Sequence, residues 1–234
     1  MSRTKVRAVQ MSMFPDIRPD KPFGPILPSV FVGSNADLID AIAPYYLTGS
    51  VCDVTFGEGA WWKRHKPADF VAHDLHKLDG VDFTDLPEPD DTYDTVCFDP
   101  PYVVSGGESS ANLSDNFQDR YGVGASRFGI GKGQPIGRER RFETMLRCGL
   151  NESIRVSRRL VLVKCMEFTQ GSFAHNDFHD IPFLMTKWAM RAGCVKHDII
   201  VHHTGSGPGG HNIFVPKRAR RHHSYLIVFR KGKP

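Results

Sequence analysis

The sequence has no Cys-x-x-Cys pair, no long apolar run and no internal repeat. Its five cysteines are scattered among apolar residues, which argues against a disulfide framework or a zinc ribbon and favours a reduced, cytoplasmic protein. No apolar run reaches the roughly 18 residues of a membrane span, and no apolar segment typical of a secretion signal follows the charged N-terminus. We therefore expect a cytoplasmic protein without a membrane partner.

The excess of positive charge is small. The 30 Lys and Arg residues outnumber the 26 Asp and Glu residues, which gives a net charge of +4 and a pI of about 8.8. This balance permits a nucleic-acid partner without requiring one. With 234 residues, of which 40% are hydrophobic, the chain is long enough for one domain with a substantial core.

The order of apolar and helical patterns predicts an α/β fold. Residues 1–33 contain five prolines and are expected to form an extended N-terminal arm, followed by a single domain over 34–234. Ser34 and Asp37 form a capping-box pattern for a helix over about 35–47. Further helices are predicted from 138 and over 182–191, and alternation with strands indicates a mostly parallel seven-stranded sheet flanked by helices. The expected strands are 50–54, 70–72, 81–83, 95–98, 160–163, 199–201 and 225–229.

A glycine-rich turn follows the first of these strands. It runs Asp53-Val54-Thr55-Phe56-Gly57-Glu58-Gly59, and Asp74 comes about 20 residues after Asp53, where an acid commonly binds ribose hydroxyls. The third glycine of a dinucleotide-binding motif is missing, so a pyrophosphate ligand is disfavoured and an adenosine ligand without phosphates fits better. The alternative for the turn alone is a tight connection between a strand and a helix. Trp61 and Trp62, which follow, are expected to pack in the core behind it.

The tetrapeptide Asp99-Pro100-Pro101-Tyr102 follows the strand predicted at 95–98. Two consecutive prolines fix φ and remove two N–H donors, which makes the end of this strand rigid. An acid and an aromatic ring flank the prolines. Since ligands bind at the carboxyl ends of strands in open α/β sheets, this tetrapeptide is a candidate reaction site.

Taken together, the Gly-x-Gly turn, the acid after the second strand and the Asp-Pro-Pro-Tyr tetrapeptide resemble the amino-group nucleic-acid methyltransferases of the N6-adenine and N4-cytosine type. The resemblance implies a Rossmann-like class I methyltransferase fold and S-adenosyl-L-methionine as cofactor. It implies that the methionine end of the cofactor faces Asp53, Thr55, Gly57 and Gly59, its ribose Asp74, and its adenine Asp82 and Phe83. It implies catalytic roles for Asp99, Pro100, Pro101 and Tyr102, in the form usually seen on adenine N6.

The chemistry of an adenine amine suits these residues. The lone pair of the amine is conjugated into the ring, and acceptors for its two hydrogens, here the Asp99 side chain and the Pro100 carbonyl, would orient it for in-line methyl transfer. Tyr102 would stack on the base after it is flipped out of a duplex. Thr55 and Phe56 depart from the common form of the glycine turn, and the chain has no separate block for target recognition. The order of the two motifs excludes the permuted members of the family.

Two loop insertions are candidates for nucleic-acid contacts, at about 103–135 and 202–223. A basic cluster follows the first, and a glycine-rich stretch ending in a second basic cluster lies in the other, which suits phosphate contacts. A solvated run of charge is the alternative for each. No metal site is predicted, because the histidines of the second loop have no cysteine or acid at metal-ligand spacing. The predicted nucleic-acid-binding residues are Arg138, Arg140, Arg141, Lys217, Arg218, Arg220 and Arg221.

The sequence therefore predicts a methyltransferase that flips an adenine out of DNA and methylates its exocyclic N6 directly. An RNA methyltransferase acting on adenine N6 or guanine N2 is the alternative enzyme, since compact enzymes without a recognition domain also act on RNA. A catalytically silent nucleic-acid-binding module is the alternative outside enzymes. The intact residues Asp99 to Tyr102 and both glycines argue against a silent module. The sequence does not indicate an oligomeric state or a recognition site.

Overall fold

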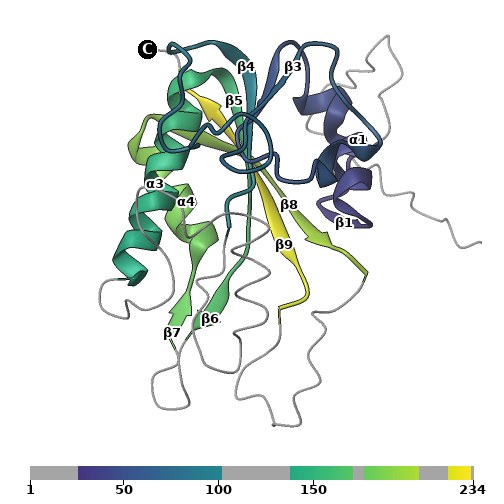
Figure 1. The fold of residues 1–234 in the computed structure, drawn as a ribbon. Helices are drawn as coiled ribbons and strands as arrows, with labels where there is room; N and C mark the ends of the chain where they lie inside the picture. The colour runs from purple at the N-terminus through teal and green to yellow at the C-terminus, as the bar shows by residue number, and fades with distance from the viewer. Residues whose placement is uncertain (1–25, 102–137, 171–176, 206–220, 233–234) are drawn as a thin grey trace, which may run out of the picture.

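The computed structural model describes residues 26–101, 138–170, 177–205 and 221–232 (Figure 1). None of the helices in these ranges is long and apolar enough to cross a membrane. In chain order the elements are β1 (Val30–Val32), α1 (Asn35–Tyr46), β2 (Val51–Asp53), η1 (Ala60–Lys63), β3 (Phe70–Ala72), β4 (Tyr93–Phe98), α3 (Arg138–Val156), β5 (Ser157–Cys165), β6 (Phe168–Gln170), β7 (Asp177–His179), α4 (Ile181–Arg191), β8 (Cys194–His203) and β9 (Ser224–Lys231).

The core of the molecule is one seven-stranded sheet with the order β1-β8-β9-β5-β4-β2-β3. This confirms the predicted seven-stranded α/β arrangement, but the sheet is mixed: β9 is antiparallel to both of its neighbours, β5 and β8, while the other pairs are parallel. β8 and β9 are consecutive among the described strands and are antiparallel to each other. An antiparallel pair of this kind needs no crossover connection, whereas a parallel pair does.

Helices cover both faces of the sheet (Figure 1). On one face α1 and η1 enclose one apolar cluster, and on the other α3 and α4 enclose a second. The start of α1 has the predicted capping box, since the Ser34 backbone N–H donates to the Asp37 carboxylate at 2.9 Å and the Asp37 N–H donates to Ser34 Oγ at 3.2 Å. Two of the four orphan N–H groups at this helix end are thereby satisfied.

One predicted strand is wrong. Residues 81–83 form no strand, and the seventh place in the sheet is taken by β1, whose three residues lie in the predicted extended arm and pair with β8. The side chain of Asp82 accepts hydrogen bonds from the Thr84 N–H at 2.9 Å and from its hydroxyl at 2.7 Å. Such a local side-chain bond competes with strand pairing, because it satisfies a backbone donor within the turn.

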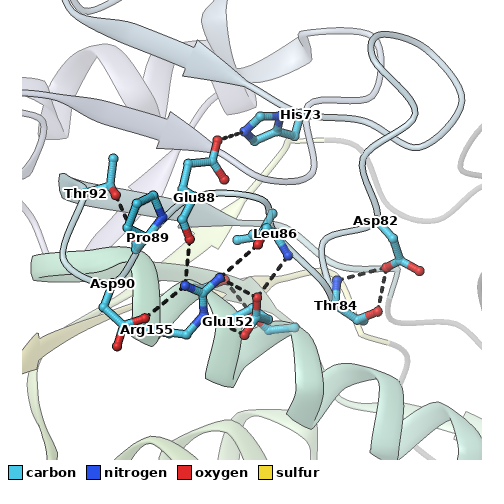
Figure 2. Close-up of polar contacts among 12 residues, drawn as sticks. His73, Asp82, Thr84, Leu86, Glu88, Pro89, Asp90, Thr92, Glu152 and Arg155 are labelled. Atoms are coloured by element: carbon cyan, nitrogen blue, oxygen red, sulfur yellow. Dashed lines mark hydrogen bonds and ion pairs between the residues drawn. The ribbon is translucent and has the colours of Figure 1, made fainter.

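Helix α3 fixes this irregular segment instead (Figure 2). The Arg155 guanidinium donates to the carbonyl oxygens of Leu86 at 3.0 Å and Glu88 at 2.7 Å, and forms an ion pair with Asp90 at 3.0 Å. Glu152, one turn earlier, accepts from Arg155 and from the Leu86 N–H at 2.9 Å. We call these five residues the Arg155 network.

His73 makes a second attachment at the end of β3. Its buried ring bonds to the Asp79 carboxylate through Nδ1 and to the Glu88 carboxylate through Nε2, each at 2.6 Å. Tyr93 at the start of β4 donates to the same Glu88 oxygen at 3.0 Å. The segment between β3 and β4 is therefore attached at its beginning and at its end, although it has no regular structure.

Candidate active site

The strand order creates a topological switch point between β2 and β4. From β2 the chain moves to β3 on one side, and then returns to β4 and β5 on the other. In open α/β sheets, ligands bind outside the carboxyl ends of the strands at such a point. Since β2 ends at Asp53 and β4 ends directly before Asp99, two of the predicted site residues lie at this edge of the sheet.

The glycine turn after β2 adopts backbone conformations that favour glycine. Gly57 has φ of +56° and Gly59 has φ of +66°. A Cβ atom on Gly59 would lie 2.7 Å from the ring of Phe56, so the close approach of these residues also requires glycine. A single 3-10 turn, η1, follows the glycines in place of an α-helix, so no helix N-terminus is available there for a pyrophosphate.

Asp74, the predicted ribose-binding acid, lies against this turn. One of its carboxylate oxygens accepts the Gly57 N–H at 2.8 Å, and the other accepts the N–H groups of His76 at 2.9 Å and Lys77 at 2.7 Å. Each carboxylate oxygen can accept more than one hydrogen bond. Asp74 can therefore hold the glycine turn and still accept from a ligand hydroxyl.

Asp53 is an interior acid, 4% exposed. Its Oδ1 accepts the Thr55 N–H at 2.9 Å, and its Oδ2 accepts the indole N–H of Trp62 at 2.6 Å. Burial, with a smaller contribution from the nearby Asp99 charge, raises the pKa of Asp53 to about 7, although both hydrogen bonds favour the charged form. A cation bound at this edge of the sheet would favour the ionised carboxylate.

Asp99 has one occupied and one open carboxylate oxygen. Oδ2 accepts the indole N–H of Trp61 at 3.0 Å, and the Asp99 backbone N–H donates to Thr55 Oγ1 at 2.8 Å. Oδ1 is buried and has no hydrogen-bond partner among the described residues. A buried acceptor without a partner is costly, and such atoms are usually explained by a ligand, an ion or a catalytic role. Asp99 therefore has an acceptor available for a bound donor.

Lys164 supplies a positive charge beside Asp99. Phe98 pairs with Val163, so Asp99, which directly follows β4, is a neighbour of Lys164 on β5. Asp99 lies two residues after Cys97, and Lys164 lies two residues after Leu162. Since Cys97 and Leu162 belong to the apolar cluster under α1, the side chains of Asp99 and Lys164 project on the same face of the sheet. Lys164 is 4% exposed. Burial raises the pKa of Asp99, and the Lys164 charge and the Trp61 hydrogen bond oppose that rise.

Replacing Lys164 with methionine is expected to raise the pKa of Asp99 further. Without the ammonium group, burial is no longer opposed by a nearby opposite charge, so the carboxyl protonates at a higher pH than in the parent protein. A ¹³C NMR titration of the Asp99 carboxyl carbon measures this directly. The variant Lys164→Arg keeps the charge and serves as the control. An unchanged titration in Lys164→Met would show that Lys164 does not control the charge of Asp99.

Asp82 and Phe83 lie in the segment attached by His73 and the Arg155 network. The Phe83 ring packs against Phe98 with centroids 5.4 Å apart, and a Cβ atom on Gly149 of α3 would lie 2.5 Å from it. Phe83 is thereby fixed directly below the end of β4. The two residues stay predicted cofactor contacts.

The other predicted site residues are described in part. Pro100 is buried and Pro101 partly buried. The guanidinium of Arg221 lies over the ring of Phe178 at 4.9 Å. Arg138, Arg140 and Arg141 form the start of α3, but their side chains lie outside the described part of the chain. Four further predicted residues lie outside it altogether, namely Tyr102, Lys217, Arg218 and Arg220.

Sequence reasoning missed three contributors to this site. Trp61 and Trp62 are buried as predicted, but their N–H groups bind Asp99 and Asp53, which a prediction of core packing does not include. Lys164 was visible as the single charge in the apolar run from Leu160 to Cys165. In the described ranges, no group of three or more His, Cys, Asp or Glu side chains could hold a metal ion.

No family model and no curated protein matches the chain. Several solved structures resemble it at low identity. A provisionally named DNA modification methylase of Thermus thermophilus, crystallised with S-adenosyl-L-methionine, is 14% identical, with a TM-score of 0.39 over 63% of this chain and 49% of its own. A provisionally named methyltransferase of Bacillus halodurans is 12% identical, with a TM-score of 0.42 over 85% of this chain and 99% of its own.

A third neighbour, named as a SAM-dependent methyltransferase of Methanosarcina mazei, is 8% identical, with a TM-score of 0.34 over 87% of this chain and 81% of its own. This chain spans about half the length of the Thermus protein. At such identities and TM-scores, the description of the fold rests on the strand order of the sheet and not on these neighbours.

Proposed function

We propose that this chain is an S-adenosylmethionine-dependent methyltransferase that acts on the exocyclic N6 of adenine in DNA. The observation that carries this proposal is the buried oxygen Asp99 Oδ1, which has no hydrogen-bond partner in the part of the chain that the structure describes and lies at the switch point of the sheet, one strand from the glycine turn. An amine with two hydrogens is the substrate group that such an acceptor suits best, because it offers a donor to Asp99 and a second one to a neighbouring carbonyl.

The residues after β2 fit the proposed cofactor. Gly57 and Gly59 allow a ligand to approach the backbone, Asp74 lies against them with acceptor capacity, and the missing α-helix N-terminus disfavours a diphosphate. We infer that Asp53 and Thr55 complete this half of the site, and that Asp82 and Phe83 border the adenine. When bound, the cofactor supplies an electrophilic methyl group on a sulfonium.

The proposed role of Asp99 is to accept and orient. As a carboxylate beside Lys164, it would accept one hydrogen of the amine through Oδ1, while the Pro100 carbonyl accepts the other. The amine lone pair would then point away from both acceptors, toward the methyl donor. Positive charge develops on nitrogen during the transfer, and a fixed carboxylate favours it electrostatically. A strong base is not required, because the amine proton becomes acidic as the new bond forms.

DNA is proposed as the substrate from the form of the tetrapeptide and the basic clusters, and the Thermus neighbour is named as a DNA modification methylase. Tyr102 would stack on the flipped base. RNA remains the competing polymer. We expect the loops at about 103–135 and 202–223 to select the sequence.

The test is methyl transfer by the purified chain from labelled S-adenosylmethionine to double-stranded DNA and to RNA, followed by mass spectrometry of the nucleosides. N6-methyladenine in DNA is the expected product, and it should be absent with Asp99→Ala. Label in RNA alone would replace the DNA assignment with the RNA alternative. Cofactor binding without transfer to either polymer would overturn the enzyme in favour of a silent binding module.

A further inference from the structure

Two consecutive tryptophans in η1 donate to two different carboxylates, that of the buried Asp53 and that of the partly buried Asp99. Trp61 Nε1 donates to Asp99 Oδ2 at 3.0 Å, and Trp62 Nε1 donates to Asp53 Oδ2 at 2.6 Å. The indoles are 5% and 8% exposed, and their ring centroids are 6.3 Å apart. One short turn after the glycines therefore connects the carboxyl ends of β2 and β4.

Apolar packing explains the burial of these rings but not the direction of their N–H groups. Trp62 packs against Phe70 of β3 with centroids 4.5 Å apart, and both indoles belong to the apolar cluster under α1. A phenylalanine could make comparable ring contacts. A buried carboxylate, in contrast, requires donors, and each tryptophan supplies one to a carboxylate that burial already disfavours as an ion.

Trp61 determines which oxygen of Asp99 is left open. The backbone of Asp99 is fixed through its N–H to Thr55 Oγ1, and the indole fixes Oδ2, so the carboxylate plane cannot rotate without losing a hydrogen bond. Oδ1 is then the oxygen that a substrate donor reaches. A catalytic acceptor works best when its orientation is set before the substrate binds.

Trp62 acts on the glycine turn, through its hydrogen bond to Asp53. Its bond to Asp53 Oδ2 leaves Oδ1 to accept the Thr55 N–H at 2.9 Å, which sets the direction of the chain as it enters the glycine turn. The Asp53 carbonyl also accepts the His73 N–H at 2.8 Å, which links the turn to β3. Asp53 therefore shapes the loop proposed to hold the cofactor.

We propose that Trp61 and Trp62 are positioning residues with separate tasks, Trp61 orienting Asp99 toward the amine and Trp62 shaping the cofactor loop through Asp53. This inference rests on the proposed function and assigns each half of the site its own indole donor. Each tryptophan is assigned its role through the one carboxylate to which it donates.

Trp61→Phe and Trp62→Phe form a matched pair, because each keeps a ring and removes one N–H. A hydrogen bond to a charged group corresponds to a change of roughly 10- to 100-fold. Trp61→Phe is expected to lower kcat by about that factor and to leave the cofactor Kd within about twofold. Because Asp99 loses a hydrogen bond that favours its charged form, its pKa should rise, and the fall of kcat on the acid side of the pH profile should begin at a higher pH. Trp62→Phe is expected to raise the cofactor Kd by about tenfold and to lower kcat at saturating cofactor by less than Trp61→Phe does. Calorimetry with S-adenosylmethionine and single-turnover methyl transfer measure the two quantities.

A variant that fails to fold is replaced by β-(3-benzothienyl)alanine at the same position, which keeps the indole shape and has sulfur in place of the N–H. Equal effects of the two substitutions on kcat and Kd, or no effect of either, would overturn the assignment. Failure of the parent protein to transfer a methyl group to any nucleic acid would instead refute the proposed function. The effect of Trp62→Phe on cofactor Kd would still be measurable in that case.

Discussion

Replacing Asp99 with alanine is expected to lower the rate of methyl transfer by roughly 10²- to 10³-fold, the usual loss when one preorganised polar group is removed from an active site. Asp99 Oδ1 is buried and has no hydrogen-bond partner within the described ranges, so the substitution removes the group proposed to orient the amine. The cofactor Kd should change little, because the contacts of the glycine turn to Asp53 and Asp74 do not include Asp99. Single-turnover transfer of labelled methyl and calorimetric titration of the cofactor test both statements.

The variant Asp99→Asn tests whether Asp99 acts as a hydrogen-bond acceptor or as a general base. Asparagine has one acceptor oxygen, but two donors compete for it, the Trp61 indole N–H and the substrate amine. The single variant should therefore be strongly impaired, and adding Trp61→Phe should restore part of the activity by removing the competing donor. A positive coupling energy in this double-mutant cycle supports the acceptor role.

Two results would contradict it. If Asp99→Asn and Asp99→Ala are equally inactive and Trp61→Phe recovers nothing, Asp99 acts through its proton affinity and not as an oriented acceptor. If Asp99→Ala retains full transfer, the reacting amine binds elsewhere.

Local patterns predicted the elements whose signals lie within a few residues of one another. The capping pair Ser34 and Asp37 gave the start of α1, and the apolar run before Asp99 gave β4. The glycine turn and Asp74 meet because the parallel neighbours β2 and β3 end at the same edge of the sheet.

The elements that depend on distant partners could not be predicted in this way. β1 is three residues long, follows a proline-rich stretch and exists as a strand through its pairing with β8. Residues 81–83 alternate like a strand, but Asp82 bonds to Thr84 and the segment is attached to α3 through Arg155. Local sequence patterns do not predict a contact between residues more than 60 positions apart, such as that of Arg155 with the Leu86 carbonyl.

The hydrogen bonds from Trp61 and Trp62 could not be predicted from the sequence for a related reason. The sequence predicts that these indoles are buried in the core. The direction of each indole N–H depends on which strand ends next to it in the fold. Trp61 and Trp62 face different strand ends because they are consecutive in one tight turn. The order of the sheet was needed before either hydrogen bond could be assigned.

Replacing Arg155 with methionine is expected to lower the free energy of unfolding by about 2 to 3 kcal/mol, less than for a fully buried ion pair because the side chain is 29% exposed. The guanidinium is the donor shared by the carbonyls of Leu86 and Glu88 and by the carboxylates of Glu152 and Asp90 (Figure 2). Methionine keeps part of the packing and removes every guanidinium donor, so the two carbonyls lose this donor and the Glu152 carboxylate loses its charged partner while it keeps the Leu86 N–H. Urea unfolding measures the loss.

Arg147→Met is the matched control, because Arg147 lies on the exposed side of the same helix α3. In Arg155→Met, hydrogen exchange should increase first at the N–H groups of Leu86 and Asp91, whose acceptors are Glu152 and the Arg155 carbonyl, and remain slow in β4 and β5. This segment also contains Asp82 and Phe83, so the cofactor Kd should rise together with its exchange rate. Equal stability of the two variants would show that the packing of Phe83 beneath β4, and not the Arg155 network, holds the segment in place.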